Sequence, residues 1–299
     1  MRFVTIAVSL LFSPLLLSVI NRSKGFLAGR QGAPLLQPYF DFARLLQKGV
    51  VYSDLSAGLV QLAPVCNLAV LIFCTLLVPL GPLPSLIHFQ GDFILFAYLM
   101  GLGRFVTMLG ALDTGSSFEG MGASREAFFS ALAEPAFFLA MAGLSKMTGS
   151  LSLTDMLQNI STEHWLYGAP SLLLILVALF LVFLAENARI PIDDPTTHLE
   201  LTMIHEVMIL DHSGPDLAMI EYGVALKIWL MAAICASILV PSGTNPLWLP
   251  LFFFLMITVG VLVALIESSM ARLRLIRVPQ LLIGAGVFAG LALFLEFVQ

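Results

Sequence analysis

Charged side chains are scarce in this sequence: Asp, Glu, Lys and Arg make up 11% of its 299 residues, against about 25% in ordinary soluble domains. Hydrophobic residues make up 59%. A chain of this composition cannot cover its surface with groups that favour water, which excludes an ordinary soluble domain. The net charge is −5 and no run of Lys or Arg occurs, so nucleic acid is not an expected partner.

Cysteine is also rare. Cys66, Cys74 and Cys235 each lie inside an apolar run, and none belongs to a Cys-x-x-Cys pair. This pattern argues against a disulfide framework and against a cysteine-based metal or iron–sulfur site on this chain. Glycine-rich phosphate loops, a nucleophile elbow and a His-Glu-x-x-His pattern are missing too, so we expect neither a catalytic residue nor a metal site.

Long apolar runs, by contrast, are abundant. Eight of them approach or reach the roughly 20 residues that cross a bilayer as an α-helix. The sequence therefore predicts an all-α, polytopic membrane protein in which residues 1–299 form a single transmembrane domain. The first run could be a signal peptide, but Arg22 and Lys24 follow it and no small-x-small cleavage site closes it, which favours a retained helix. The predicted spans are Phe3–Ile20, Leu59–Leu80, Phe93–Leu112, Ala127–Met147, Ser171–Ala185, Tyr222–Val240, Leu247–Ile266 and Leu281–Val298.

The placement of basic residues predicts the orientation of these helices. Ten of the 14 Lys and Arg residues follow the first, third, fifth and seventh spans, whereas only Arg2 and Lys146 lie on the opposite side. By the positive-inside rule the ten are cytoplasmic and both termini lie outside, in a cytoplasmic (inner) membrane. The ten residues are Arg22, Lys24, Arg30, Arg44, Lys48, Arg125, Arg189, Arg272, Arg274 and Arg277.

Two cytoplasmic segments have the pattern of interfacial helices. In Pro38–Lys48, apolar residues oppose charged ones, which is typical of a helix that lies in the membrane surface. Asp194 and Pro195 supply an N-cap and a first-turn proline to a second amphipathic helix that we expect to reach Leu210. It stops at Ser213–Pro215, where the sequence is Ser-Gly-Pro.

Several ionisable residues fall inside or at the ends of the predicted spans, where a charge costs at least about 2.5–3.5 kcal/mol on insertion scales. Arg104 and Glu134 lie within spans, and Pro135 removes a helical hydrogen bond next to Glu134. The two residues form either a structural ion pair or part of a polar path through the membrane. Lys227, Glu186 and Glu267 lie nearer the span ends, where they either reach the interface or extend that path.

His198, His205 and His212 are spaced seven residues apart and would share one face of a helix. Zinc or haem ligation would need closer spacing or ligands from elsewhere. We therefore expect a solvated or interface face.

Four motifs resemble the membrane subunit of formate hydrogenlyase and hydrogenase-4, and a fifth, Glu186–Asp193, resembles its wider relative, subunit 1 of complex I (NADH dehydrogenase). The resemblance covers nearly the whole chain and keeps the order of the motifs. Arg104 and Lys227 favour the group 4 [NiFe]-hydrogenase branch. The motifs are Gly32–Tyr39 (GAPLLQPY), Gly110–Phe118 (GALDTGSSF), Gly122–Ala127 (GASREA), Glu186–Asp193 (ENARIPID) and Glu267–Leu275 (ESSMARLRL).

This resemblance implies a membrane-anchor and ion-coupling subunit without catalysis of its own. Its cytoplasmic loops would dock an arm of hydrogenase large and small subunits and iron–sulfur subunits, and antiporter-like subunits would adjoin it in the bilayer. The [NiFe] centre and the Fe–S clusters would belong to the partners, with no cofactor on this chain. The implied coupling residues are Arg104, Glu134, Glu186, Asp193, Glu200, Lys227 and Glu267. The docking candidates are Arg30, Asp113, Arg125, Glu126, Arg189, Arg272 and Arg274.

Two alternatives remain open on sequence grounds. The chain could be the quinone-binding subunit of a complex I-type dehydrogenase, with the quinone held between the first cytoplasmic loop and the acidic segment Glu186–Glu221. It could also be an independent transporter, although the internal repeats of many transporters are missing.

Overall fold

The computed structural model describes residues 2–52, 56–193, 203–241, 243 and 247–298, and this part of the chain is all-α, without strands. Eight of its helices are long and apolar enough to cross a membrane, which confirms the number of predicted spans. They are α1 (Arg2–Leu27), α3 (Leu59–Leu77), α4 (Asp92–Asp113), α5 (Ser117–Thr148), α8 (Ala169–Glu186), α9 (Gly214–Leu239), α10 (Trp248–Ser269) and α11 (Val278–Val298). The shorter elements are α2 (Gln37–Leu46), α6 (Leu153–Gln158), α7 (Thr162–Tyr167) and two 3-10 turns, η1 (Glu206–Ile209) and η2 (Leu275–Arg277).

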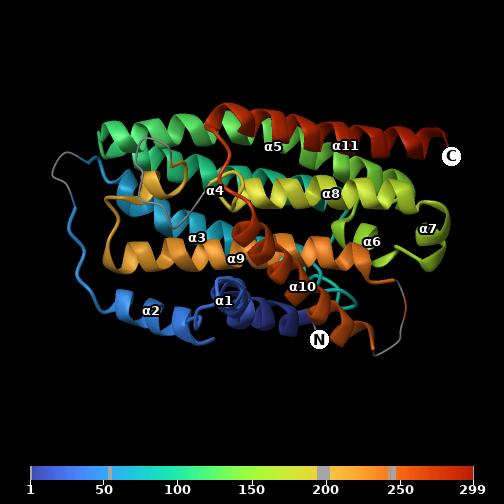
Figure 1. The fold of residues 1–299 in the computed structure, drawn as a ribbon, viewed down its shortest axis with the longest axis horizontal. Helices are drawn as coiled ribbons and strands as arrows, with labels where there is room; N and C mark the ends of the chain where they lie inside the picture. Colours follow the sequence, from blue (N-terminus) through green and yellow to red (C-terminus); the bar gives the residue numbers. More distant parts are fainter. Residues whose placement is uncertain (1, 53–55, 194–202, 242, 244–246, 299) are drawn as a thin grey trace.

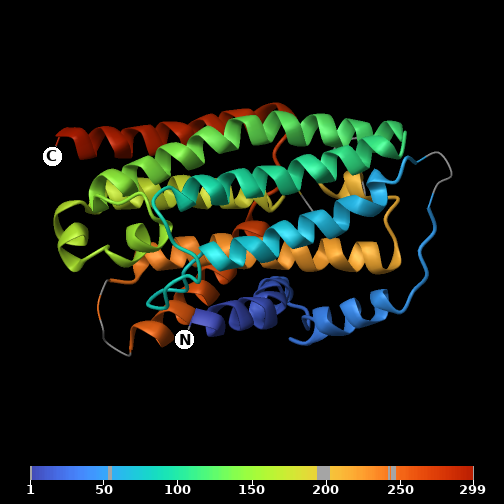
Figure 2. The same cartoon turned by 180° about the vertical axis from the view of Figure 1, so that it is seen from behind.

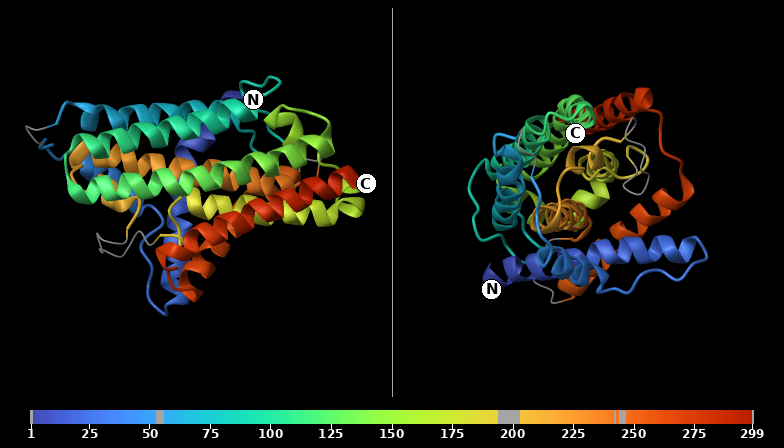
Figure 3. Two further views of the ribbon diagram at one scale, coloured as in Figure 1. Left: turned by 90° about the horizontal axis from the view of Figure 1, so that it is seen from above. Right: turned by 90° about the vertical axis from the view of Figure 1, so that its left-hand side faces the viewer.

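The helices divide into a bundle and two crossing helices. Helices α3, α4, α5, α8, α9 and α11 run side by side along the long axis of the molecule (Figures 1 and 2), whereas α10 crosses obliquely. In the end-on view of Figure 3, the blue α1 is seen along its length, so it lies across the bundle. Helix α9 is central: 78% of its most apolar stretch is buried, against 22–44% for the other spans.

A proline in α1 creates a contact that holds α1 against α9. Pro14 has no backbone N–H, so the carbonyl of Leu10 loses its helical donor. The Tyr222 hydroxyl of α9 donates to that carbonyl at 2.7 Å. Two turns further along α9, Trp229 Nε1 donates to Ser9 Oγ at 3.1 Å.

Two spans, α5 and α9, begin more than one helical turn earlier than the sequence predicted. Helix α5 starts at Ser117 rather than Ala127, so the Gly122–Ala127 motif is helical and not part of a loop. Gly120 and Gly122 weaken the local helix propensity, and packing in the folded chain overrides it. Helix α9 starts at Gly214 rather than Tyr222. The Ser-Gly-Pro sequence that was expected to stop a preceding helix begins α9 instead, with the proline in its first turn.

The prediction of a second interfacial helix is wrong for the residues that the structure describes. Residues 194–202 lie outside the described residues, while Met203–Ser213 forms turns and the 3-10 turn η1. Met203 and Val207 are buried, because this segment folds onto α5 instead of lying on a surface. A Cβ atom at Gly122 would come within 2.4 Å of Val207 Cγ1 and 3.0 Å of the Ile204 carbonyl oxygen, so the contact requires glycine.

The first predicted interfacial segment does form a helix, α2, which contains no buried residue. The Tyr39 hydroxyl donates to the carbonyl of Leu11 in α1, and the rings of Phe42 and Tyr222 meet edge to face at 5.7 Å. Helix α2 is therefore fixed on α1 and α9. Its place at a cytoplasmic interface and the orientation of the termini stay predictions.

Candidate functional site

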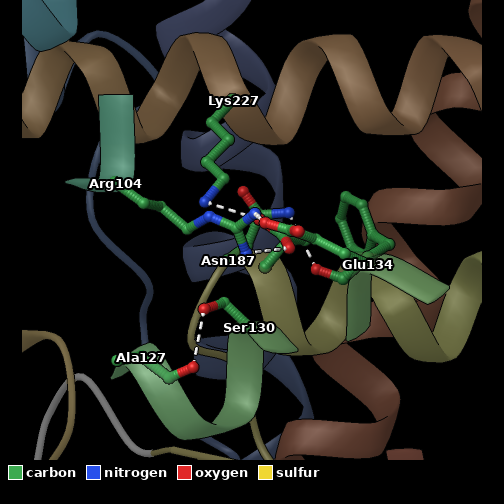
Figure 4. Close-up of polar contacts among 8 residues, drawn as sticks. Arg104, Ala127, Ser130, Glu134, Asn187 and Lys227 are labelled. Carbon is green, nitrogen blue, oxygen red and sulfur yellow. Dashed lines mark hydrogen bonds and ion pairs between the residues drawn. The ribbon is translucent and has the colours of Figure 1, made fainter. Parts of the chain in front are cut away.

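Four charged residues from four helices form one chain of ion pairs inside the bundle. Lys227 Nζ in α9 lies 3.0 Å from Glu186 Oε2 at the end of α8. The other Glu186 oxygen lies 2.5 Å from Arg104 Nη1 in α4, and Arg104 Nη2 lies 2.5 Å from Glu134 Oε1 in α5. Figure 4 shows Lys227, Arg104 and Glu134 pointing toward one another. The sequence raised Arg104 and Glu134 as a pair; the structure adds Glu186 and Lys227, and we call these four residues the charged network.

Local features allow the four side chains to meet. Gly103 lets α3 approach α4, since a Cβ there would lie 2.6 Å from Asn67 Oδ1. Gly101 lies on α4 beside Glu134, whose Oε1 would be at an ordinary van der Waals distance, 3.5 Å, from an added Cβ. Asn187 follows Glu186 and donates from Nδ2 to the Phe183 carbonyl at 2.8 Å, which fixes the chain just after the end of α8.

The network borders a small cavity of about 40 Å³, which Arg104, Glu186 and Lys227 help to line and which we call the inner cavity. That volume holds about three waters, because one water needs roughly 10–15 Å³. Glu126 also lines this cavity, although the sequence suggested that it faces a docked arm. The difference arises because residue 126 is part of α5 and not of a loop. Within the described residues Glu126 forms no ion pair, and it is the second carboxyl of this cavity beside Glu186 of the charged network.

The members of the network differ in exposure. The side chains of Arg104, Glu186 and Lys227 are 9%, 8% and 15% exposed, whereas that of Glu134 is 46% exposed. A second cavity of about 30 Å³ is lined by Arg104, Glu134 and Glu186 among other residues. The network therefore runs from the interior of the chain to its surface, at a position inside a membrane-spanning helix.

Glu267 is the centre of a second ionic cluster. Its two carboxylate oxygens lie 2.9 Å from Lys24 Nζ and 3.4 Å from Arg189 Nη1, and its side chain is fully buried. The cluster joins α1, α10 and the segment after α8. Arg189 is also buried, so the side chain expected to contact a docked arm points into the chain instead.

Asp193 organises a third cluster. Arg272 Nη2 lies 3.0 Å from Asp193 Oδ1, and Oδ2 accepts hydrogen bonds from the backbone N–H groups of Ile204 and His205 at 2.9 and 3.2 Å. Arg125 donates to the Met203 carbonyl at 2.7 Å. Arg125 and Arg272, two docking candidates, thus hold the Met203–Ser213 segment in place.

A larger cavity of about 410 Å³ adjoins the first, and we call it the mouth cavity. Lys24, Arg189, Asp193 and Glu221 are among its lining residues, and His205 and Asn187 line both cavities. Burial, and next the positive charge of Lys227, lowers the pKa of His205 to about 4. His205 is therefore a neutral group at pH 7 between the mouth cavity and the charged network. Burial likewise lowers the pKa of His212 in the mouth cavity.

The remaining sequence candidates lie apart from these clusters. Arg30 and Arg274 are exposed. Asp113 accepts hydrogen bonds from the backbone N–H groups of Ala57 and Val60 at 3.0 and 3.2 Å, so it caps the start of α3. Glu200 lies outside the described residues. In the part of the chain that the structure describes, no group of three or more His, Cys, Asp or Glu residues could hold a metal ion.

Three further acids are buried although the sequence did not single them out. Glu119 accepts from the Asp211 backbone N–H at 3.0 Å, Asp216 accepts from the Tyr52 hydroxyl at 2.7 Å, and Asp92 accepts from Ser152 Oγ at 3.0 Å. Each lies in the first turn of a helix, where acids are common for electrostatic reasons. Their position in a first helical turn is the sequence feature that could have identified these three acids, and it indicates that they stabilise the helix starts.

Comparisons with known proteins agree with this architecture. The family model described as NADH dehydrogenase matches residues 1–297. Formate hydrogenlyase subunit 4 of Escherichia coli is 31% identical over 94% of this chain and 92% of its own length. Hydrogenase-4 component C of the same organism is 30% identical over 78% and 73% of the two chains.

A solved structure extends the comparison to the fold. A chain of the membrane-bound sulfane sulfur reductase, an archaeal respiratory membrane complex, has the same fold, with a TM-score of 0.84, 18% identity and 99% and 98% coverage of the two chains. Together with the eight apolar helices, these matches confirm the resemblance expected from the motifs. The chain is a multi-pass membrane protein that belongs to the NADH dehydrogenase subunit 1-like family, together with formate hydrogenlyase subunit 4 and hydrogenase-4 component C.

Proposed function

We propose that this chain is the membrane-anchor and ion-coupling subunit of a multi-subunit, energy-converting [NiFe]-hydrogenase complex. It docks a cytoplasmic arm of hydrogenase and iron–sulfur subunits and links electron transfer in that arm to translocation of protons or sodium ions. The observation that carries the proposal is the charged network, which extends from Lys227 and Glu186 through Arg104 to the half-exposed Glu134.

Buried charges are costly for the stability of the fold. Each ion placed in a low-dielectric interior loses several kcal/mol of hydration, and apolar side chains of the same size would often stabilise the fold more. A purely structural role is therefore a poor explanation for a two-cation, two-carboxylate chain with a further carboxyl, Glu126, at its cavity. Intramembrane ionisable groups of this kind are typical of ion and proton paths.

The arrangement suggests how charge would be transmitted. Redox chemistry in the docked arm alters the charge or conformation of the segment that contains Asp193 and His205, which lines the mouth cavity. His205 and Asn187 line both this cavity and the inner cavity, so such a change would reach Glu126, Glu186 and Arg104 across the inner cavity that they line. Because Arg104 bridges Glu186 and Glu134, a proton gained by either acid releases the guanidinium toward the other.

The exposed side chain of Glu134 suggests that another membrane subunit packs beside this chain. A carboxylate that is 46% exposed within a span would face lipid if the chain were alone, which is unfavourable. A polar surface of an antiporter-like subunit packed over α4 and α5 would shield Glu134 and receive the charge. The exposed Arg30 and Arg274 are available to contact the soluble arm.

Purification in mild detergent, followed by mass spectrometry and metal analysis, tests the assembly directly. We expect a nickel-containing large subunit, iron–sulfur subunits and antiporter-like subunits to co-purify with the tagged chain. A homogeneous particle of this chain alone would refute the proposal and favour an independent transporter.

A second candidate function is quinone binding in a complex I-type dehydrogenase. It is favoured by the mouth cavity, whose volume of about 410 Å³ falls in the range of about 300–1,000 Å³ typical of small-molecule sites. A photoreactive quinone should then label peptides from α1 or from Glu186–Glu221. Labelling that is absent from both regions would count against this function.

A further inference from the structure

A second large hollow lies on the opposite side of α1 from the mouth cavity. It is a groove of about 400 Å³ between α1, α9 and α10, lined among others by Phe12, Leu15, Val19, Trp229, Phe253 and Ile257. Every lining residue is apolar. The indole N–H of Trp229 does not face an open polar space, because it donates to Ser9. Leu17, Asn21 and Lys24 of α1 line the mouth cavity instead, and the helical repeat of 3.6 residues places them on the other face.

The groove is long enough to hold much of a fatty acyl chain. Its α1 lining extends from Val8 to Val19, about 16 Å at a rise of 1.5 Å per residue. The acyl chains of one leaflet span a similar length, about half of a hydrocarbon core of about 30 Å. Because α1 lies across the bundle, an acyl chain in the groove would follow α1 rather than the long axis of the bundle.

A cation lies at one end of this apolar stripe. Arg22 follows Val19 by three residues, and so lies on the same face of α1 one turn further on. It is exposed and forms no ion pair with the carboxylates that the structure describes. Gly32 packs against the Arg22 backbone, and Leu35, three residues later, lines the groove.

We propose that the groove binds one anionic phospholipid, with an acyl chain between α1, α9 and α10 and the phosphate at Arg22. Charge complementarity selects this ligand: an uncharged isoprenoid quinone would fill the apolar part but would leave Arg22 without an anion. The lipid would fill the space created where α1 and α10 cross the bundle, and would hold α1 beside the mouth cavity.

Trp229 provides a direct probe of the groove. The full chain with Trp165→Phe and Trp248→Phe retains Trp229 as its one tryptophan and is placed in phosphatidylcholine vesicles. These vesicles contain the same fraction of either brominated phosphatidylglycerol or brominated phosphatidylcholine, whose bromine atoms quench nearby indole fluorescence. We expect brominated phosphatidylglycerol to bind at the quenching site with an affinity about fivefold higher than that of brominated phosphatidylcholine. One arginine near an anionic headgroup should give a preference of this size.

Matched variants make the test decisive. Arg22→Gln should abolish the preference for the anionic lipid, whereas Arg277→Gln, at another exposed arginine, should leave it unchanged. Leu15→Phe should block the groove and reduce quenching by both lipids, with helical content confirmed by circular dichroism. Equal quenching by the two lipids, a preference that survives Arg22→Gln, or displacement of phosphatidylglycerol by an uncharged isoprenoid quinone would overturn the proposal.

Discussion

Arg104 Nη2 lies 2.5 Å from Glu134 Oε1, although Arg104 is 9% exposed and the Glu134 side chain is 46% exposed. The guanidinium is thus a buried group that holds a carboxylate at the surface of a membrane-spanning helix. Its other nitrogen, Nη1, holds Glu186 at the same distance. One planar cation with five donors can bridge two acids in this way, whereas an ammonium group cannot do so with the same geometry.

Replacement of Arg104 should therefore destabilise the fold. Arg104→Met leaves Glu186 buried opposite Lys227 alone and leaves Glu134 without a partner, and we expect a loss of about 3–5 kcal/mol in the free energy of unfolding. Arg104→Lys should lower the free energy of unfolding by less, because it keeps a positive charge. Unfolding in detergent measures both changes. Arg274→Met, which removes an exposed arginine, is the control, and equal effects at the two positions would contradict a bridging role.

The contact between α5 and the Met203–Ser213 segment depends on Gly122. Gly122→Ala places a methyl group within 2.4 Å of Val207 Cγ1, and overpacking of this kind costs about 1–3 kcal/mol. Gly120→Ala is the matched control, because a Cβ there meets its nearest neighbour at 3.9 Å. Limited proteolysis between residues 203 and 213 should accelerate in the Gly122 variant alone. Equal protection of the two variants would show that the segment is held by other contacts.

The Lys24–Glu267 ion pair should couple α1 to α10. Because Glu267 is fully buried, a double-mutant cycle of Lys24→Met and Glu267→Gln should give an interaction energy of about 1–3 kcal/mol. The corresponding cycle with Arg30→Met, at an exposed arginine, should give a value near zero. Additive effects of Lys24→Met and Glu267→Gln would mean that the pair contributes no coupling.

His205 should make stability depend on pH. Burial and Lys227 lower its pKa from 6.5 to about 4 in the folded chain, so the unfolded chain binds a proton between these values and the folded chain does not. The contribution to stability is then complete above pH 6.5 and is lost as the pH falls toward 4. Unfolding measured across this range should show a smaller loss in His205→Gln than in the parent chain. A histidine ¹⁵N NMR signal of His205 that reports a protonated ring at pH 6 would contradict this prediction.

Much of the fold could be predicted because its signals are local. The eight spans follow from apolar length, and Arg104 and Glu134 stand out as charges within those spans. The start of α5 could not be found locally, since Gly122 reads as a helix breaker until Val207 is known to pack against it. The Ser213–Pro215 sequence was similarly ambiguous, because a serine and a proline can end one helix or begin the next.

The site was only partly predictable for the same reason. Glu126 and Arg189 were expected on a docking surface because the family resemblance implies that the cytoplasmic loops dock a soluble arm. The direction of the Glu126 side chain depends on which face of α5 lines the inner cavity. The direction of the Arg189 side chain depends on how the chain turns after Glu186. The bridge from Arg104 to Glu186 likewise joins residues 82 positions apart, and no sequence spacing reveals it.

The most direct test of the coupling role is ion pumping by a Glu134→Gln variant of the complex in sealed membrane vesicles. A coupling role predicts that hydrogenase activity with a soluble dye is retained while the number of ions moved per hydrogen turned over falls at least about tenfold. Glu163→Gln, at an exposed acid in α7, should change neither quantity. Pumping at the parent ratio in Glu134→Gln would remove Glu134 from the path and contradict the proposed function of the charged network.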